Sequence, residues 1–224
     1  MNQKIKNRIP EDELLIADEV VKGFDHQDKS LSFLRLPIIY KCMRDGISQG
    51  RILEAGCGPG ILGLTLLEKC RSNNISLVGI DGSEGMVEQS RRNAKERNLE
   101  MCTEYCAANL VTIPYPDNSF DGIISNGSLH HWVDPIRVFF ELVRVLKQSG
   151  KIFINDLRRD SHAIPRTLLF PLLSQWQKKH FILSQNASYT VDECKNMLTS
   201  ASLTGWTITT TIMEFEIRGT LRKI

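Results

Sequence analysis

The segment that most constrains the fold runs from residue 51 to residue 60 and reads RILEAGCGPG. Its apolar first half is typical of a buried β-strand, and residues 61–69 resume with helical spacing. Gly56, Gly58 and Gly60 lie between the two patterns and carry no Cβ, so they permit a tight turn and let a ligand approach the main chain. The helix that follows directs its first amide groups at the same turn. We therefore expect a binding loop for a small ligand.

Strand and helix patterns alternate along the rest of the chain. Strands are predicted over 51–55, 75–80, 101–107, 120–125 and 151–156, helices from Ser83, from Asp134 to Gly150 and from Thr190 to before Gly205, and a closing antiparallel hairpin within 206–224. Strands separated by helices of this length pair in parallel with right-handed crossovers. The sequence therefore predicts an α/β fold, a doubly wound, mostly parallel, Rossmann-like sheet of seven strands with an antiparallel C-terminal strand.

Two helical additions interrupt this alternation. Apolar residues recur at helical intervals over 11–23 and 31–44, with a polar turn at 25–30, which predicts an N-terminal helical segment over residues 1–46. This segment is either a packing cap on the sheet or a lid over the ligand. Prolines at 165 and 171 predict a helical insertion over 161–182, after the fifth strand. We expect residues 1–224 to form a single domain.

Composition excludes several classes of function. The 224 residues carry 28 Lys and Arg against 26 Asp and Glu, so no strong positive field would attract nucleic acid or an acidic membrane. No run approaches the roughly 18 apolar residues of a membrane-spanning helix, and the polar start argues against a signal peptide. The six cysteines form no Cys-x-x-Cys and the five histidines no His-x-x-x-His, so no metal is predicted. We expect a cytoplasmic protein with reduced thiols; its oligomeric state is left open.

Polar residues follow four of the predicted strands. Glu54 follows the first strand, Asp81 the second, Asn109 the third and Asn126 the fourth. In a doubly wound sheet, ligands bind outside these carboxyl ends of the strands. Asp81 lies about 25 residues after the glycine turn, where a carboxylate commonly accepts hydrogen bonds from both ribose hydroxyls. The alternative for Asp81 is an acid that favours the dipole of the next helix.

Two classes of nucleotide-like ligand fit this plan. Residues 58–63, GPGILG, match the G-x-G-x-x-G fingerprint of dinucleotide sites, which makes an NAD(P)-dependent oxidoreductase one alternative. The carboxylate of Glu54 at the strand end would repel a pyrophosphate, but it suits a cationic ligand with an amine or a sulfonium group. The chain also lacks the Tyr-x-x-x-Lys pair of short-chain dehydrogenases and the Lys-containing phosphate loop.

The segment EAGCGPG at 54–60 resembles the E/D-x-G-x-G-x-G signature of class I S-adenosylmethionine-dependent methyltransferases. Similar motifs follow at 113–121, at 128–132 and at 143–150, where Gln148-Ser149 replaces the family's Pro-Gly, and Asn109-Leu110 stands where the family usually has Asp-Ala beside the adenine. The resemblance implies S-adenosylmethionine as the cofactor. It implies the following cofactor-binding residues: Glu54, Gly56, Cys57, Gly58, Gly60, Asp81, Gly82, Met86, Asn109, Leu110 and Asn126.

Methyl transfer from a sulfonium is an in-line displacement that depends mainly on alignment. A general base is needed only where the acceptor must lose a proton, and His130 or His131 could serve. The alternative is that both histidines orient the loop or contact the cofactor. Amino-methylating enzymes of adenine or glutamine carry [N/D]-P-P-[Y/F] here, whereas this chain has NGSL at 126–129. We therefore expect a small-molecule acceptor and no nucleic acid.

Candidates for binding the acceptor are Tyr40, Asp156, Arg158 and Arg159. The two arginines could hold an anionic group of the acceptor, although solvated surface arginines are the alternative. An isolated Tyr40, like His26, is more often a packing residue. A further alternative for the whole chain is a protein that binds S-adenosylmethionine without transferring its methyl group.

Overall fold

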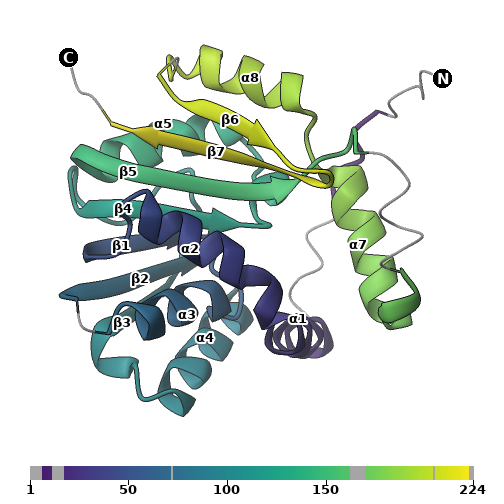
Figure 1. Cartoon of the computed structure of the whole chain (residues 1–224), viewed down its shortest axis with the longest axis horizontal. Coiled ribbons are helices and arrows are strands. Elements are labelled where there is room, and N and C mark those ends of the chain that lie inside the picture. The colour runs from purple at the N-terminus through teal and green to yellow at the C-terminus, as the bar shows by residue number, and fades with distance from the viewer. Residues whose placement is uncertain (1–6, 12–17, 72, 162–169, 204, 222–224) are drawn as a thin grey trace.

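A seven-stranded sheet forms the centre of the computed structural model, which describes residues 7–11, 18–71, 73–161, 170–203 and 205–221. The strand order is β3-β2-β1-β4-β5-β7-β6 (Figure 1). The strands are β1 (Gly50–Ala55), β2 (Ile75–Asp81), β3 (Thr103–Ala107), β4 (Phe120–Asn126), β5 (Leu146–Leu157), β6 (Thr207–Thr210) and β7 (Glu214–Thr220). Among these strands β7 alone runs in the opposite direction to the other six, and it pairs antiparallel with both β5 and β6. The predicted fold class is confirmed.

Helices cover both faces of the sheet (Figure 1). They are α1 (Asp18–Ser30), α2 (Leu36–Arg44), α3 (Ile61–Lys69), α4 (Glu84–Glu96), α5 (Pro135–Val145), α7 (Gln175–Ala187) and α8 (Val191–Ser200), with short 3-10 turns η1 (Ser32–Arg35), η2 (Glu100–Cys102), η3 (Leu129–His131) and η4 (Phe170–Leu172). The described part of the chain contains no helix that is long and apolar enough to cross a membrane.

Two apolar clusters, one on each face, explain why the strands are apolar throughout. On one face Ile52 packs with residues of α2, α3 and α4, and on the other Leu53 packs with residues of α5 and α8. The same division separates Ile124 from Ile123 in β4, since successive side chains of a strand point to opposite faces. Strands buried on both faces read as continuous apolar runs rather than alternating ones.

The structure differs from the sequence prediction at the end of α1 and at the junction of α5 with β5. The predicted turn at 25–30 is the end of α1, where Lys29 pairs with Asp25 one turn earlier at 3.1 Å. Helix α5 ends at Val145, and β5 begins at Leu146 instead of residue 151. Leu146 is fully buried and pairs with Phe120 across a register shift, so it belongs to the sheet rather than to the helix face.

The predicted insertion at 161–182 lies partly outside the described residues, which exclude 162–169. Its described part contains η4 and α7, and α7 continues to Ala187. A capping box of Ser174 and Gln177 starts α7, a signal that the sequence prediction missed. Residues 12–17, predicted as helical, also lie outside the described part.

Candidate functional site

A cavity of about 830 Å³ lies at the carboxyl ends of the parallel strands. Its floor consists of the loops after β1, β2, β3, β4 and β5, and α1, η1 and α7 contribute its walls. Figure 1 shows α1 and α7 beyond this end of the sheet. The volume is within the range of about 300–1,000 Å³ that is usual for small-molecule sites.

The glycine loop between β1 and α3 depends on backbone conformations that favour glycine. Gly56, Gly58 and Gly60 have φ angles of +70°, +52° and +77°. A Cβ on Gly56 would lie 1.8 Å from Oγ of Ser128, so the loop after β4 presses directly against the loop after β1. The Gly56 amide donates to the Ile80 carbonyl at 2.8 Å and thereby joins the loop to β2. Only glycine fits at position 56.

Asp81 at the end of β2 holds the glycine loop from the other side. Its Oδ2 accepts a hydrogen bond from the Gly58 amide at 2.8 Å, and its Oδ1 accepts one from the Ser83 amide at 2.9 Å. Burial raises the pKa of Asp81, and these two N–H groups oppose that increase. A Cβ placed on Gly58 would meet no atom within 4 Å, because Gly58 faces the open cavity.

Glu54 lies beneath the loop with only 3% of its surface exposed. Its Oε1 accepts from the Gly63 amide at 3.3 Å, and its Oε2 is buried with no hydrogen-bond partner among the described residues. Burial raises the pKa of Glu54 to about 8. The carboxyl is therefore mostly neutral at pH 7 until a cation approaches. In the sequence-based prediction Glu54 is instead a charged carboxylate.

The loops after β3 and β4 complete the cavity floor. Asn109 Oδ1 accepts from the Val111 amide at 3.0 Å, and Asn126 Oδ1 accepts from Nδ2 of Asn155 at 2.9 Å. All residues predicted to bind the cofactor line the cavity except Gly60, which precedes the first residue of α3. The structure therefore brings the predicted set together, although the roles of its members stay predictions.

His130 and Asp156, predicted separately, form one hydrogen-bonded pair. His130 Nδ1 lies 2.8 Å and 3.0 Å from the two carboxylate oxygens of Asp156, which also accepts from the His130 amide at 2.9 Å. Both side chains are almost fully buried and line the cavity. Burial lowers the pKa of His130, but the charge and hydrogen bond of Asp156 outweigh burial and raise it.

His131 differs in its environment from its neighbour. Its side chain is 25% exposed, and burial together with the nearby His130 lowers its pKa to about 3. The two rings are 4.1 Å apart between centroids. Both histidines approach Glu11, whose Oε2 lies 3.7 Å from Nε2 of His130 and 3.8 Å from Nε2 of His131.

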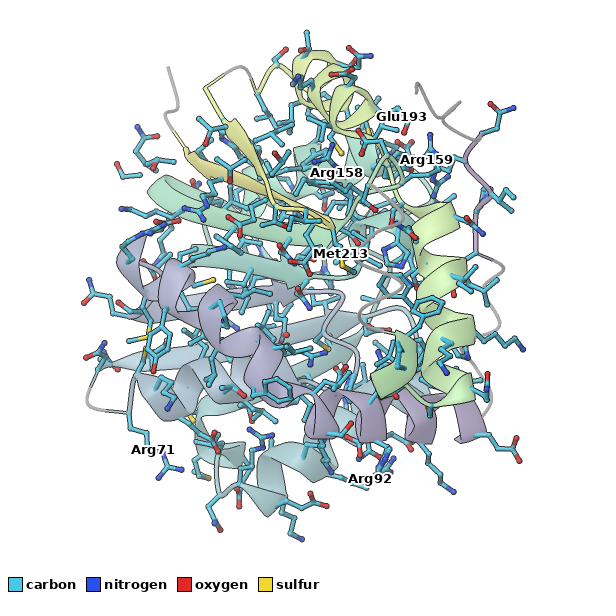
Figure 2. The ribbon with its side chains drawn as sticks, turned by 45° about the vertical axis from the view of Figure 1, so that its right-hand side comes forward. Arg71, Arg92, Arg158, Arg159, Glu193 and Met213 are labelled. Atoms are coloured by element: carbon cyan, nitrogen blue, oxygen red, sulfur yellow. The ribbon has the colours of Figure 1, made fainter. Side chains whose placement is uncertain are left out.

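The other predicted acceptor residues lie elsewhere. Arg158 pairs with Asp160 at 2.8 Å and Arg159 pairs with Glu193 at 2.6 Å, so both guanidinium groups are engaged in local ion pairs. Figure 2 shows Arg158, Arg159 and Glu193 grouped together. Tyr40 is 55% exposed on α2. None of Arg158, Arg159 and Tyr40 is part of the cavity wall that the described residues form, so the geometry does not support them as acceptor ligands.

Two further groups at the site were missed from the sequence. Asp28 of α1 and Arg35 of η1 form an ion pair, and both line the cavity near Glu54. Glu11 reaches the histidines because the Ile9 amide donates to the Asn186 carbonyl at 3.1 Å and attaches this segment to α7. No motif marks these residues, since their positions depend on how the flanking helices pack.

Comparison with known proteins identifies the central part of the chain. The sequence profile of the methyltransferase domain family matches residues 53–154, which include the glycine loop, Asp81 and the strands up to β5. This segment is therefore similar to a methyltransferase domain. Demethylmenaquinone methyltransferase of Symbiobacterium thermophilum is 33% identical over 127 residues, and 27-O-demethylrifamycin SV methyltransferase of Amycolatopsis mediterranei is 31% identical over 106 residues.

These alignments cover 56% and 47% of this chain, and the chain covers only 49% and 38% of the two relatives. The similarity of fold, unlike the similarity of sequence, extends beyond this segment to the flanking helices. A candidate S-adenosylmethionine-dependent methyltransferase from Methanococcus maripaludis superposes with a TM-score of 0.76 at 23% identity, covering 100% of this chain and 98% of that one. The chain thus has the class I methyltransferase fold.

Proposed function

We propose that the protein transfers a methyl group from S-adenosylmethionine to a small-molecule acceptor. The observation that carries this proposal is the open space at Gly58, whose amide donates to the Asp81 carboxylate, in a cavity that Glu54 also lines. A ligand there would meet a hydrogen-bond acceptor for a ribose and a carboxyl for an ammonium group. The names of the two relatives support the same class of reaction.

The residues of the cavity fit the parts of S-adenosylmethionine. Asp81 would accept hydrogen bonds from the ribose, and Asn109 and Leu110 would contact the adenine. Glu54 would pair with the ammonium group, and Arg35 with the carboxylate of the methionine moiety. The bound sulfonium supplies a methyl group that is already activated for displacement, so the protein mainly has to bind and align.

Alignment of the acceptor is the task of the cavity walls. The loop after β4, with His130 and His131, lies on one side, and apolar side chains of α1, η1 and α7 lie on the other, among them Phe24, Leu34 and Phe181. Holding the acceptor in line with methyl and sulfur lowers the barrier by up to about 7–11 kcal/mol. We assign this wall, formed by parts of the segments 1–46 and 161–182, to the acceptor pocket. We also propose that the whole chain forms one domain.

A screen of metabolite pools with radiolabelled S-adenosylmethionine tests the proposal. We expect S-adenosylhomocysteine to form only when a fraction contains the acceptor, with the label in a small molecule. Binding of S-adenosylmethionine without methyl transfer to any fraction would instead favour a protein that only binds the cofactor. Transfer of label to RNA or protein would exclude a small-molecule acceptor.

Binding of S-adenosylmethionine should release a proton from Glu54. The pKa of about 8 makes Glu54 mostly protonated at pH 7, and pairing with an ammonium group would ionise it. We therefore expect release of most of one proton at pH 7 and an affinity that increases from pH 6 to pH 7. Calorimetry in buffers of different ionisation enthalpy measures the release. The Glu54→Gln variant should show no release and weaker binding; wild-type protein without release would contradict the pairing.

Arg35 should contribute to affinity through the carboxylate of the methionine moiety. The double variant Asp28→Asn/Arg35→Gln removes both charges of the ion pair, so neither is left buried alone. We expect it to bind S-adenosylmethionine about 10–100-fold more weakly, because one charge-assisted hydrogen bond contributes about that much affinity. An analogue that lacks the carboxylate should bind both proteins equally. The matched control is Arg92→Gln on the exposed side of α4, which should leave the affinity unchanged. If the double variant loses equal affinity for S-adenosylmethionine and for the analogue, Arg35 contributes through packing and not through the carboxylate.

We also propose a cytoplasmic location. All six cysteines are free thiols, and Cys42, Cys57, Cys70 and Cys194 are buried. Free thiols are typical of a reducing compartment.

A further inference from the structure

A cluster of three metal-binding side chains forms one side of the acceptor region. Glu11, His130 and His131 each offer one ligand atom, and these three atoms lie within 4.8 Å of one another. Glu11 Oε2 is 3.7 Å from Nε2 of His130 and 3.8 Å from Nε2 of His131. The side chains are buried or nearly so, with 8%, 3% and 25% of their surface exposed in the same order. Three such atoms where little water reaches them are balanced either by a proton on His130 or by a cation between them.

His130 is oriented as a metal ligand. In the neutral ring with its hydrogen on Nδ1, donated to Asp156, the lone pair of Nε2 faces Glu11. That Nε2 is buried and has no hydrogen-bond partner among the described residues. The Leu157 amide in turn donates to Asp156 at 2.7 Å and fixes the carboxylate. A carboxylate behind a ligating histidine is the usual arrangement at protein metal sites, where it fixes the ring and increases its basicity.

Glu11 is also held in place. Ser184 of α7 donates from Oγ to Oε2 of Glu11 at 3.2 Å. Arg8 is the cation nearby, but its Nη2 donates to the His130 carbonyl at 2.8 Å and its Nε to the Ala187 carbonyl at 2.6 Å. Two carboxyl groups, of Glu11 and Asp156, thus lie around the His130 ring with one guanidinium nearby, a setting that suits a divalent cation.

We propose that Glu11, His130 and His131 bind a divalent transition metal, with Zn²⁺ as the ion to which we commit. Two imidazole nitrogens and one carboxylate are a common ligand set for three-ligand zinc sites with an open position. Tetrahedral zinc at about 2.0–2.1 Å from each ligand holds the ligand atoms roughly 3.3–3.5 Å apart. The two distances to Glu11, 3.7 Å and 3.8 Å, need shortening by a few tenths of an ångström, and the two imidazole atoms, within 4.8 Å of each other, would also have to move together.

The open position faces the cavity, because His130 and His131 line it. A metal there would bind a hydroxyl oxygen of the acceptor and lower its pKa, a role that rests on the proposed methyl transfer. The hydroxyl proton passes to solvent, an oxygen lone pair forms the new bond to the methyl carbon, and the carbon–sulfur bond breaks to leave a neutral thioether. The metal site itself does not depend on this role.

Calorimetric titration of the chelator-treated, untagged full chain with Zn²⁺ tests the site. We expect one equivalent to bind with a Kd of micromolar or below, and Co²⁺ to give the visible spectrum of a site with few ligands. Glu11→Gln and His131→Gln should each weaken binding at least 100-fold, and Asp156→Asn about 10–100-fold. Controls are His26→Gln on α1 and the double variant Cys102→Ser/Cys106→Ser, which should bind like wild type.

Two results would overturn the metal site: absence of stoichiometric Zn²⁺ binding, or Zn²⁺ binding that survives both Glu11→Gln and His131→Gln. The cluster would then be an ion pair between Glu11 and a protonated His130. S-adenosylmethionine binding by the same metal-free protein is measured in parallel and confirms that each variant is folded. Loss of cofactor binding by the metal-free wild type with retained Zn²⁺ binding would contradict the proposed function and not the metal site. The two proposals therefore fail separately.

Discussion

The Gly58→Ala variant should fold but bind S-adenosylmethionine at least 100-fold more weakly than wild type. The new Cβ meets no protein atom within 4 Å, so the folded state loses only what the φ of +52° costs an alanine, about 1–2 kcal/mol. The methyl group instead projects into the cavity beside Asp81, where the cofactor would touch the main chain. Calorimetry measures the affinity, and thermal unfolding measures the stability.

Gly46→Ala is the matched control for this substitution. Gly46 has a φ of +88° and lies away from the cavity, with only the flexible end of Lys151 near the added Cβ, at 3.1 Å. It should lose a similar amount of stability and retain full affinity. Gly58→Ala with wild-type affinity would mean that the ligand does not approach this loop.

Asp81→Ala should reduce the affinity for S-adenosylmethionine by about 100-fold or more. Each hydrogen bond to a charged group is worth about 1.5–3 kcal/mol, and a ribose offers two hydroxyls to the carboxylate. The variant also frees the Gly58 amide and loosens the loop. Asp81→Asn retains one acceptor oxygen and should bind with intermediate affinity.

Asp117→Ala serves as the control for the loss of an acid. Asp117 precedes β4 at the opposite end of the sheet, is 66% exposed and pairs with Arg144. Its loss should leave cofactor affinity unchanged. If Asp81→Ala leaves the affinity unchanged, Asp81 does not bind the ribose and only stabilises the start of α4.

The sheet could be predicted because its strands carry strong local signals. Ile52 and Leu53 are buried on opposite faces, and that double burial produces the apolar run that marks β1 in the sequence. The start of β5 at Leu146 could not be predicted in the same way. An apolar residue after a helical pattern continues the helix as well as it starts a strand, and only pairing with Phe120 decides between them.

The cofactor half of the site was also predictable, because Asp81 and the glycines stand at strand ends that the fold brings together. The acceptor half was not. Glu11 and Arg35 have no motif around them, and they reach the cavity through packing of α7 and η1 against the rest of the fold. Arg158 follows a strand end, but its guanidinium pairs with Asp160, and no motif in the sequence indicates that local ion pair.

Calorimetry with S-adenosylmethionine, S-adenosylhomocysteine and NAD(P) is the most direct test of the central claim that the cavity is a methyl-donor site. We expect the first two to bind in competition with one another at one site per chain, and binding of both to be lost in Gly58→Ala. NAD(P) should not bind. Tight binding of NAD(P) with no binding of S-adenosylmethionine or its demethylated product would contradict the claim.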